Sequence, residues 1–141
     1  MRFWDASALL PLLVQEQTSS RMAELFTGGE EPASVWLFSM VEVTSALCRL
    51  FRMKEIHQQD LEKALETWKE ISEEVTWIRD FEMVQERALR VLRLHPLKAA
   101  DALQLASALV AVTDRTTSHQ FVTLDKQLAE AANKEGFQVI Y

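Results

Sequence analysis

Residues 98–114 read KAADALQLASALVAVTD, and the fifteen residues between Lys98 and Asp114 carry a single charge, that of Asp101. The remaining positions are apolar around almost the whole circumference of a helix, which predicts a central helix over 99–112. Removing an unpaired carboxylate from water is costly, so a lone acid at the start of such a helix needs a partner or contact with solvent. Asp101 is therefore a first candidate for a functional residue.

Short apolar runs alternate with amphipathic stretches on both sides of this helix. Strands are predicted at 2–5, 33–36, 75–78, 120–124 and 137–141. Helices are predicted at 7–17 with a bend at Pro11, and at 20–27, 38–53, 58–74, 81–94 and 126–134. Strands that alternate with helices indicate an α/β fold, a three-layer α/β/α sandwich with a short, mainly parallel central sheet.

The composition favours one compact domain over 1–141, since 48% of the residues are hydrophobic and 26% are charged. The single cysteine excludes an intramolecular disulfide and a cysteine-based zinc cluster, which fits a reducing cytoplasm. Asp5 and Pro11 interrupt the only segment that resembles a signal peptide, and no apolar run predicts a membrane span. The net charge of −6 argues against a generic nucleic-acid binder, but not against a protein whose acids hold metal ions.

The isolation of Asp101 is repeated three times along the chain. Asp5, Glu42 and Asp125 are each the only charged residue in a long stretch, and the four stretches together hold 55 residues. Capping of a helix is a sufficient explanation for an aspartate near a predicted helix start, and it applies to Asp5, Asp101 and Asp125. It does not apply to Glu42, which lies within a predicted helix, although contacts with Ser45 or Arg49 would explain it.

Asp5 and Asp125 directly follow predicted strands, and the ligand crevice of an open parallel sheet lies at the carboxyl ends of its strands. Carboxylates that meet there repel one another and raise one another's pKa. A hard divalent cation relieves this repulsion. Carboxylate oxygens suit Mg²⁺ or Mn²⁺ better than zinc.

Four segments that contain these acids, FWDASALLPLL, MVEVTSAL, HPLKAADALQLASAL and FVTLDKQLAEAANKEGFQVI, resemble in order the motifs of PIN-domain ribonucleases. The resemblance is in particular to the VapC toxins of toxin–antitoxin pairs, and it extends over nearly the whole chain. It implies that Asp5, Glu42, Asp101 and Asp125 are the catalytic and metal-binding acids. Ser7 and Thr123 match the small hydroxyl residues that accompany the first and the fourth acid.

The resemblance implies Mg²⁺- or Mn²⁺-dependent hydrolysis of single-stranded RNA, a cognate antitoxin as partner, and a homodimer. Such ions activate water and offset the charge that builds on the phosphate, so the products are a 5′-phosphate and a 3′-hydroxyl. Arg49 and Arg52, followed by Lys54, are candidates for binding flanking phosphates. A solvated, dipole-stabilised helix end explains these three residues equally well.

Other classes of function remain as alternatives. A haloacid-dehalogenase-type phosphatase requires an acid at the position of Ser7, and a receiver domain requires an acidic pair after a strand, which is missing. A housekeeping PIN-type nuclease and a catalytically silent PIN-fold binding module stay open. The four tryptophans are expected to be core anchors, and His95 is expected to end a helix.

Overall fold

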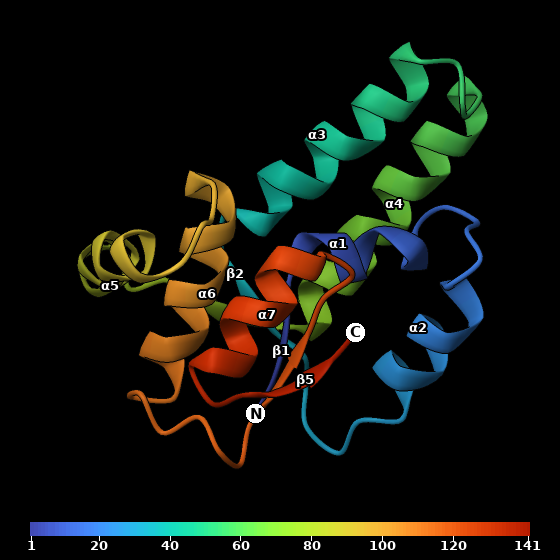
Figure 1. The fold of residues 1–141 in the computed structure, drawn as a ribbon. Helices are drawn as coiled ribbons and strands as arrows, with labels where there is room; N and C mark the ends of the chain where they lie inside the picture. Colours follow the sequence, from blue (N-terminus) through green and yellow to red (C-terminus); the bar gives the residue numbers. More distant parts are fainter.

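A computed structural model describes residues 1–141 and shows a five-stranded sheet with helices on both faces (Figure 1). Every pair of neighbouring strands is parallel, and the strand order is β3-β2-β1-β4-β5. The strands are β1 (Arg2–Trp4), β2 (Ser34–Trp36), β3 (Thr76–Ile78), β4 (Gln120–Val122) and β5 (Gln138–Ile140). The predicted α/β/α sandwich is confirmed, and its sheet is parallel throughout.

Seven α-helices and one short 3₁₀ helix connect and follow the strands. They are α1 (Ala6–Leu9), the 3₁₀ helix η1 (Leu10–Leu12), α2 (Ser19–Thr27), α3 (Ser39–Arg52), α4 (Gln58–Glu74), α5 (Phe81–Leu94), α6 (Ala99–Ala111) and α7 (Lys126–Lys134). Helices α3 and α4 form an arm that extends beyond the rest of the molecule (Figure 1). None of the helices is both long and apolar enough to cross a membrane.

Consecutive residues of each strand face opposite helical layers, because side chains alternate along a strand. Phe3 of β1 belongs to the core formed with α5, α6 and α7. Trp4, the next residue, belongs to a second core formed with α1 to α4. The strands are covered on both faces and are therefore apolar at successive positions, as is usual for parallel sheets.

Helix α6 is buried on almost every side, as its sequence predicts. Its buried residues are Ala102, Gln104, Leu105, Ala106, Ser107, Ala108 and Leu109. The predicted core role of the tryptophans also holds for Trp4, Trp36 and Trp68, which are all at most 3% exposed. Most of the buried side chains of α6 are apolar, and Gln104 is the largest polar one among them.

The prediction of one bent helix over 7–17 is wrong. Helix α1 ends at Leu9 and continues as the 3₁₀ turn η1, which contains Pro11. Proline has no N–H to donate to the preceding turn, so the helix tightens and then ends at Leu12. Strand β4 also ends two residues earlier than predicted, at Val122, while the remaining elements agree with prediction to within two residues.

Candidate active site

The order of the strands changes direction at β1. The chain adds β2 and β3 on one side of β1, and then crosses to add β4 and β5 on the other side. In parallel sheets a crevice opens at such a switch point, beyond the carboxyl ends of the two strands that flank it. Asp5 immediately follows β1, and Asp125 lies three residues beyond the end of β4, so both acids are directed to this crevice.

The hydroxyl groups of Ser7 and Thr123 join the two segments that carry these acids. The Ser7 Oγ lies 3.3 Å from the Thr123 Oγ1, and it accepts a hydrogen bond of 2.8 Å from the Leu124 N–H. The Thr123 Oγ1 in turn accepts a hydrogen bond of 3.0 Å from the Asp125 N–H. The predicted association of these two hydroxyl residues with the first and fourth acids is therefore seen as direct contact between the two loops.

Asp5 is the most deeply buried of the four acids, with 4% of its surface exposed. Its Oδ1 accepts hydrogen bonds from the Ser7 Oγ (2.8 Å) and from the Ala8 N–H (3.3 Å), which makes it the N-cap of α1. Burial raises the pKa of its carboxyl from 3.8 to about 6, although the hydrogen bonds from Ser7 and Thr123 oppose the shift. Capping explains the position of Asp5 but not the burial of its charge.

Glu42 lies in the first turn of α3 and contacts neither of the residues that its helical spacing suggested. Instead its Oε1 accepts a hydrogen bond of 3.0 Å from the Nε2 of Gln104 on α6. Burial raises the pKa of Glu42 from 4.5 to about 7, and the negative charges of Asp5 and Asp101 contribute to the rise. The raised pKa of Glu42 therefore reflects the nearby charges of Asp5 and Asp101 in addition to burial.

Asp101 and Asp125 complete the set. Asp101 lies in the first turn of α6, so it is not the N-cap, which is Lys98, but it is close enough to the helix start to interact favourably with it. Burial and then the charge of Asp125 raise the pKa of Asp101, while Lys98 lowers it. Asp125 is the N-cap of α7, and its Oδ1 accepts a hydrogen bond of 2.7 Å from the Leu128 N–H.

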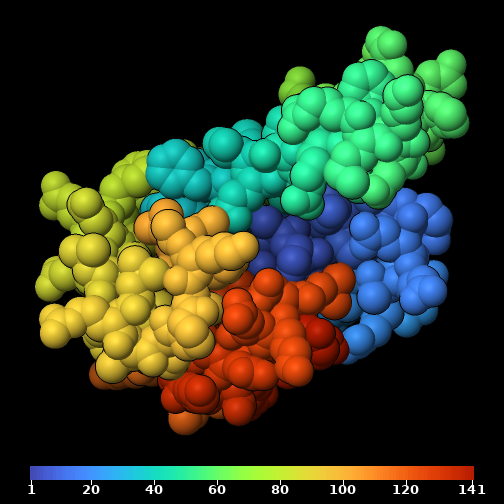
Figure 2. Space-filling view, turned by 45° about the horizontal axis from the view of Figure 1, so that its top comes forward, coloured from blue at the N-terminus to red at the C-terminus, as the bar shows by residue number.

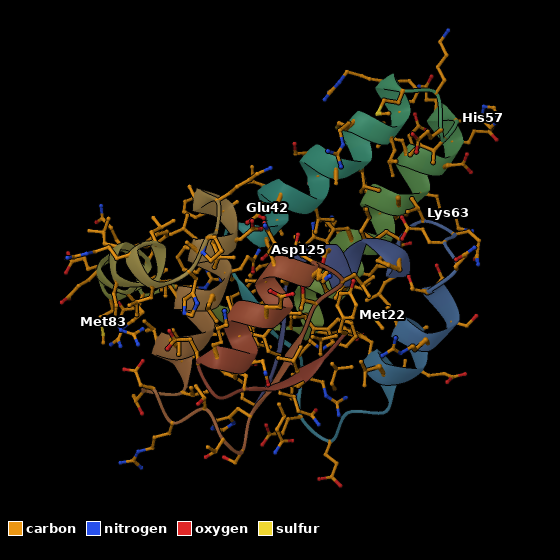
Figure 3. All side chains as sticks on the ribbon, in the orientation of Figure 1. Met22, Glu42, His57, Lys63, Met83 and Asp125 are labelled. Carbon is orange, nitrogen blue, oxygen red and sulfur yellow. The ribbon has the colours of Figure 1, made fainter.

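A hollow opens on one face of the molecule where α3, α6 and α7 meet above the start of α1 (Figure 2), and each of the four acids lies on or directly before one of these helices. Glu42 and Asp125 lie at neighbouring ends of α3 and α7, whereas His57 lies at the far tip of the arm (Figure 3). No three of the His, Cys, Asp and Glu side chains form a ready-made metal site. The donor set nevertheless consists of carboxylate oxygens that repel one another, and this is the environment that a hard divalent cation stabilises.

The other predicted residues lie outside this cluster. Arg49 and Arg52 are exposed further along α3, and no salt bridge joins either of them to an acid. His95 ends α5 as predicted, and its Nε2 also lies 2.7 Å from the Oε1 of Glu135. Gln104 escaped sequence analysis because a single amide in an apolar helix carries no distinctive spacing.

Comparison with known proteins places the chain among toxin-related proteins, although no family model matches it. It is 32% identical over 121 residues to "Ribonuclease VapC45" of Mycobacterium tuberculosis, covering 80% of this chain and 83% of that protein. The structure resembles a toxin–antitoxin complex from Klebsiella pneumoniae with a TM-score of 0.67 and 16% identity, over 100% of this chain and 97% of the other. It resembles FitAcB from Neisseria gonorrhoeae with a TM-score of 0.69 and 13% identity, over the same shares.

The raised pKa values predict that the metal-free protein loses stability as the pH rises. Between about pH 4 and pH 7 the folded state binds more protons at Asp5 and Glu42 than the unfolded state does. The contribution of these two acids to the free energy of unfolding is therefore greatest below this range and falls as the pH rises through it. Urea unfolding in EDTA at pH 5 to 8 should show a flatter pH dependence for Glu42→Gln than for the parent. At pH 8, Asp101→Asn should be at least as stable as the parent. Parallel curves for parent and Glu42→Gln would contradict this prediction.

Proposed function

The chain belongs to the VapC ribonuclease family, and on this premise we propose that it is an endoribonuclease that cleaves single-stranded RNA with the help of Mg²⁺ or Mn²⁺. We further propose that it acts as the toxin of a toxin–antitoxin pair. The observation that supports the proposal is that Asp5 and Asp101 raise the pKa of Glu42, and Asp125 raises that of Asp101, although these acids come from separate parts of the chain. Burial raises the pKa of Asp5 to about 6, and burial together with the charges of Asp5 and Asp101 raises that of Glu42 to about 7.

The four acids would hold the divalent ion, which supplies activation of water and stabilisation of negative charge on the phosphate when it is bound. The chain itself holds the acids in place. Ser7 and the N–H of Ala8 fix the carboxylate of Asp5, and the N–H of Leu128 fixes that of Asp125.

Arg49 and Arg52 are proposed to bind phosphates that flank the cleaved bond. They follow Glu42 along the same helix, and Arg49 is two turns further on. They are exposed and unpaired, so they are free to contact an RNA backbone. Their contribution is expected to weaken with salt, since it comes from the release of counterions.

We expect RNA cleavage to require Mg²⁺ or Mn²⁺ and to stop in EDTA. Asp5→Asn and Asp101→Asn should each lower the cleavage rate at least roughly a hundredfold, because each removes a charge that holds the ion. Asp80→Asn is the matched control, since Asp80 caps α5 through the Met83 N–H but belongs to no acid cluster. Full activity of either site variant would remove that residue from the site, and 2′,3′-cyclic phosphate products would exclude the proposed mechanism.

An antitoxin segment is proposed to dock in a groove beside the tip of the α3–α4 arm. The groove has a volume of about 790 Å³ and lies between the segment after α1 and the arm. Its lining includes Leu12, Leu13 and Val14 together with the acids Glu16, Glu55 and Asp60 and a single lysine, Lys63. An apolar segment with basic flanks fits this lining, and the net charge of −6 favours its association.

Expression of the chain alone in bacteria is expected to arrest growth, and Asp5→Ala should relieve the arrest. Co-expression of the adjacent small gene should also relieve it, with the two proteins purifying together. Ala23→Trp, which fills the groove from α2, should remain toxic but escape this neutralisation. The control is Ala111→Trp, because Ala111 is equally exposed but lies at the end of α6.

Harmless expression of a folded protein that binds Mn²⁺ would count against the toxin role. RNA cleavage by that protein would then favour a housekeeping nuclease, and its absence would favour a silent binding module.

A homodimer is proposed to form through an exposed aromatic surface beside the hollow. Phe38 and Phe81 are 46% and 48% exposed, and their ring centroids lie 5.6 Å apart, with Trp36 buried beneath them. Val41 extends the same apolar surface along α3 and is 62% exposed. Contiguous apolar surface is uncommon on monomers. In a dimer with two-fold symmetry, this surface of one copy would pack against the same surface of the other.

The double variant Phe38→Ser/Phe81→Ser should shift the protein to a monomer in sedimentation velocity at micromolar concentration. Met53→Ser is the control, since Met53 is 60% exposed but lies at the tip of the arm. An unchanged sedimentation coefficient for the double variant, or a monomeric parent, would reject this surface as the dimer contact.

A further inference from the structure

Gln104 is the only amide side chain buried among the apolar residues of α6. It is 1% exposed and lies three residues after Asp101, so both residues occupy the same side of the helix. Its Nε2 donates two hydrogen bonds, one to the Ser39 Oγ (2.8 Å) and one to the Glu42 Oε1 (3.0 Å). Both of its N–H groups are therefore used to bind residues of α3.

The remaining oxygen of Gln104 has no partner. Its Oε1 is buried and accepts no hydrogen bond, which is unfavourable because the group has lost its contact with water. Rotation of the amide by half a turn would place this oxygen against the Glu42 carboxylate, so the observed orientation is the one that the carboxylate requires. A leucine would fill the same space without an unsatisfied atom, and packing alone therefore does not account for a glutamine at this position.

Glu42 depends on Gln104 for its orientation. Gln104 is the only residue that donates a hydrogen bond to the Glu42 side chain, and it contacts the Oε1 alone. The second oxygen of Glu42 receives no hydrogen bond from the protein, so it is available to a ligand. Ser39, which is completely buried, holds the amide from the other side.

We propose that Gln104 is a positioning residue that holds the Glu42 carboxylate with one oxygen anchored and the other presented to the divalent cation. The inference rests on the proposed function, which gives Glu42 a place among the acids that hold this ion. Because α6 carries Gln104 and Asp101 on the same side, the hydrogen bond to Glu42 also sets the separation between the acids of α3 and α6. Partners behind a metal ligand commonly affect metal affinity by ten- to a hundredfold.

The test is a double-variant cycle that combines Gln104→Met with Glu42→Gln. Methionine keeps the length and approximate volume of glutamine but removes both donors. The dissociation constant for Mn²⁺, measured by calorimetry at one fixed pH, should rise roughly tenfold in Gln104→Met. In the Glu42→Gln background the same substitution should change it less than about twofold, because Gln104 acts through the charge of Glu42.

Stability and catalysis provide independent measurements. In EDTA, Gln104→Met should unfold at nearly the same urea concentration as the parent, since it removes the unsatisfied oxygen but also leaves the buried Ser39 Oγ without its partner. With Mg²⁺, kcat for RNA should fall while KM stays within about twofold. Ser107→Ala is the matched control, because Ser107 is a buried polar residue one turn further along α6 that bonds only to the Gln104 backbone, and it should leave Mn²⁺ affinity unchanged.

Equal loss of Mn²⁺ affinity in both backgrounds, or marked destabilisation of Gln104→Met in EDTA, would overturn the inference and make Gln104 a core residue. If Glu42→Gln impairs Mn²⁺ binding and Gln104→Met does not, the inference alone fails and the proposed function stands. If Glu42→Gln itself changes neither Mn²⁺ binding nor cleavage, both the role of Glu42 and the inference fail.

Discussion

The burial of the Asp5 carboxylate at the end of the central strand is the constraint around which the site is arranged. A parallel sheet directs the carboxyl ends of all its strands to one edge, and the change of direction at β1 leaves a crevice there. The Ser7 and Thr123 hydroxyls occupy the floor of this crevice and tie the β1 and β4 loops together. The loops that carry Asp5 and Asp125 are thereby held side by side, although they are far apart in sequence.

These acids work against the stability of the metal-free fold, because burial and, for Glu42 and Asp101, neighbouring carboxylates raise the energy of the charged form. The two apolar cores on either side of the sheet must supply the stability that the site removes. Helix α6 is buried on almost every side, and the strands contribute side chains to both cores. Metal binding would then stabilise the protein as well as activate it.

The helices that cover the sheet also separate the surfaces that the proposed function requires. Helices α3, α6 and α7 border the hollow of the acids, and the α3–α4 arm with η1 and α2 borders the groove. The exposed aromatic residues lie at the starts of α3 and α5, on the side of the hollow away from that groove. The surfaces proposed for RNA, for a second copy and for an antitoxin segment are therefore distinct from one another.

Residue pattern alone determined the number and order of the strands and helices after residue 17, because apolar runs and helical periodicity are local properties. It also singled out the four acids, because an isolated charge in an apolar stretch is visible without coordinates. It misjudged the helix around Pro11, which depends on the detailed path of the backbone. Only the tertiary structure decided that Glu42 bonds to Gln104 rather than to a neighbour on its own helix, because that contact joins residues 62 positions apart. The same holds for the shared rise in pKa of Asp5, Glu42 and Asp101, since desolvation and proximity arise only when the helices pack around the end of the sheet.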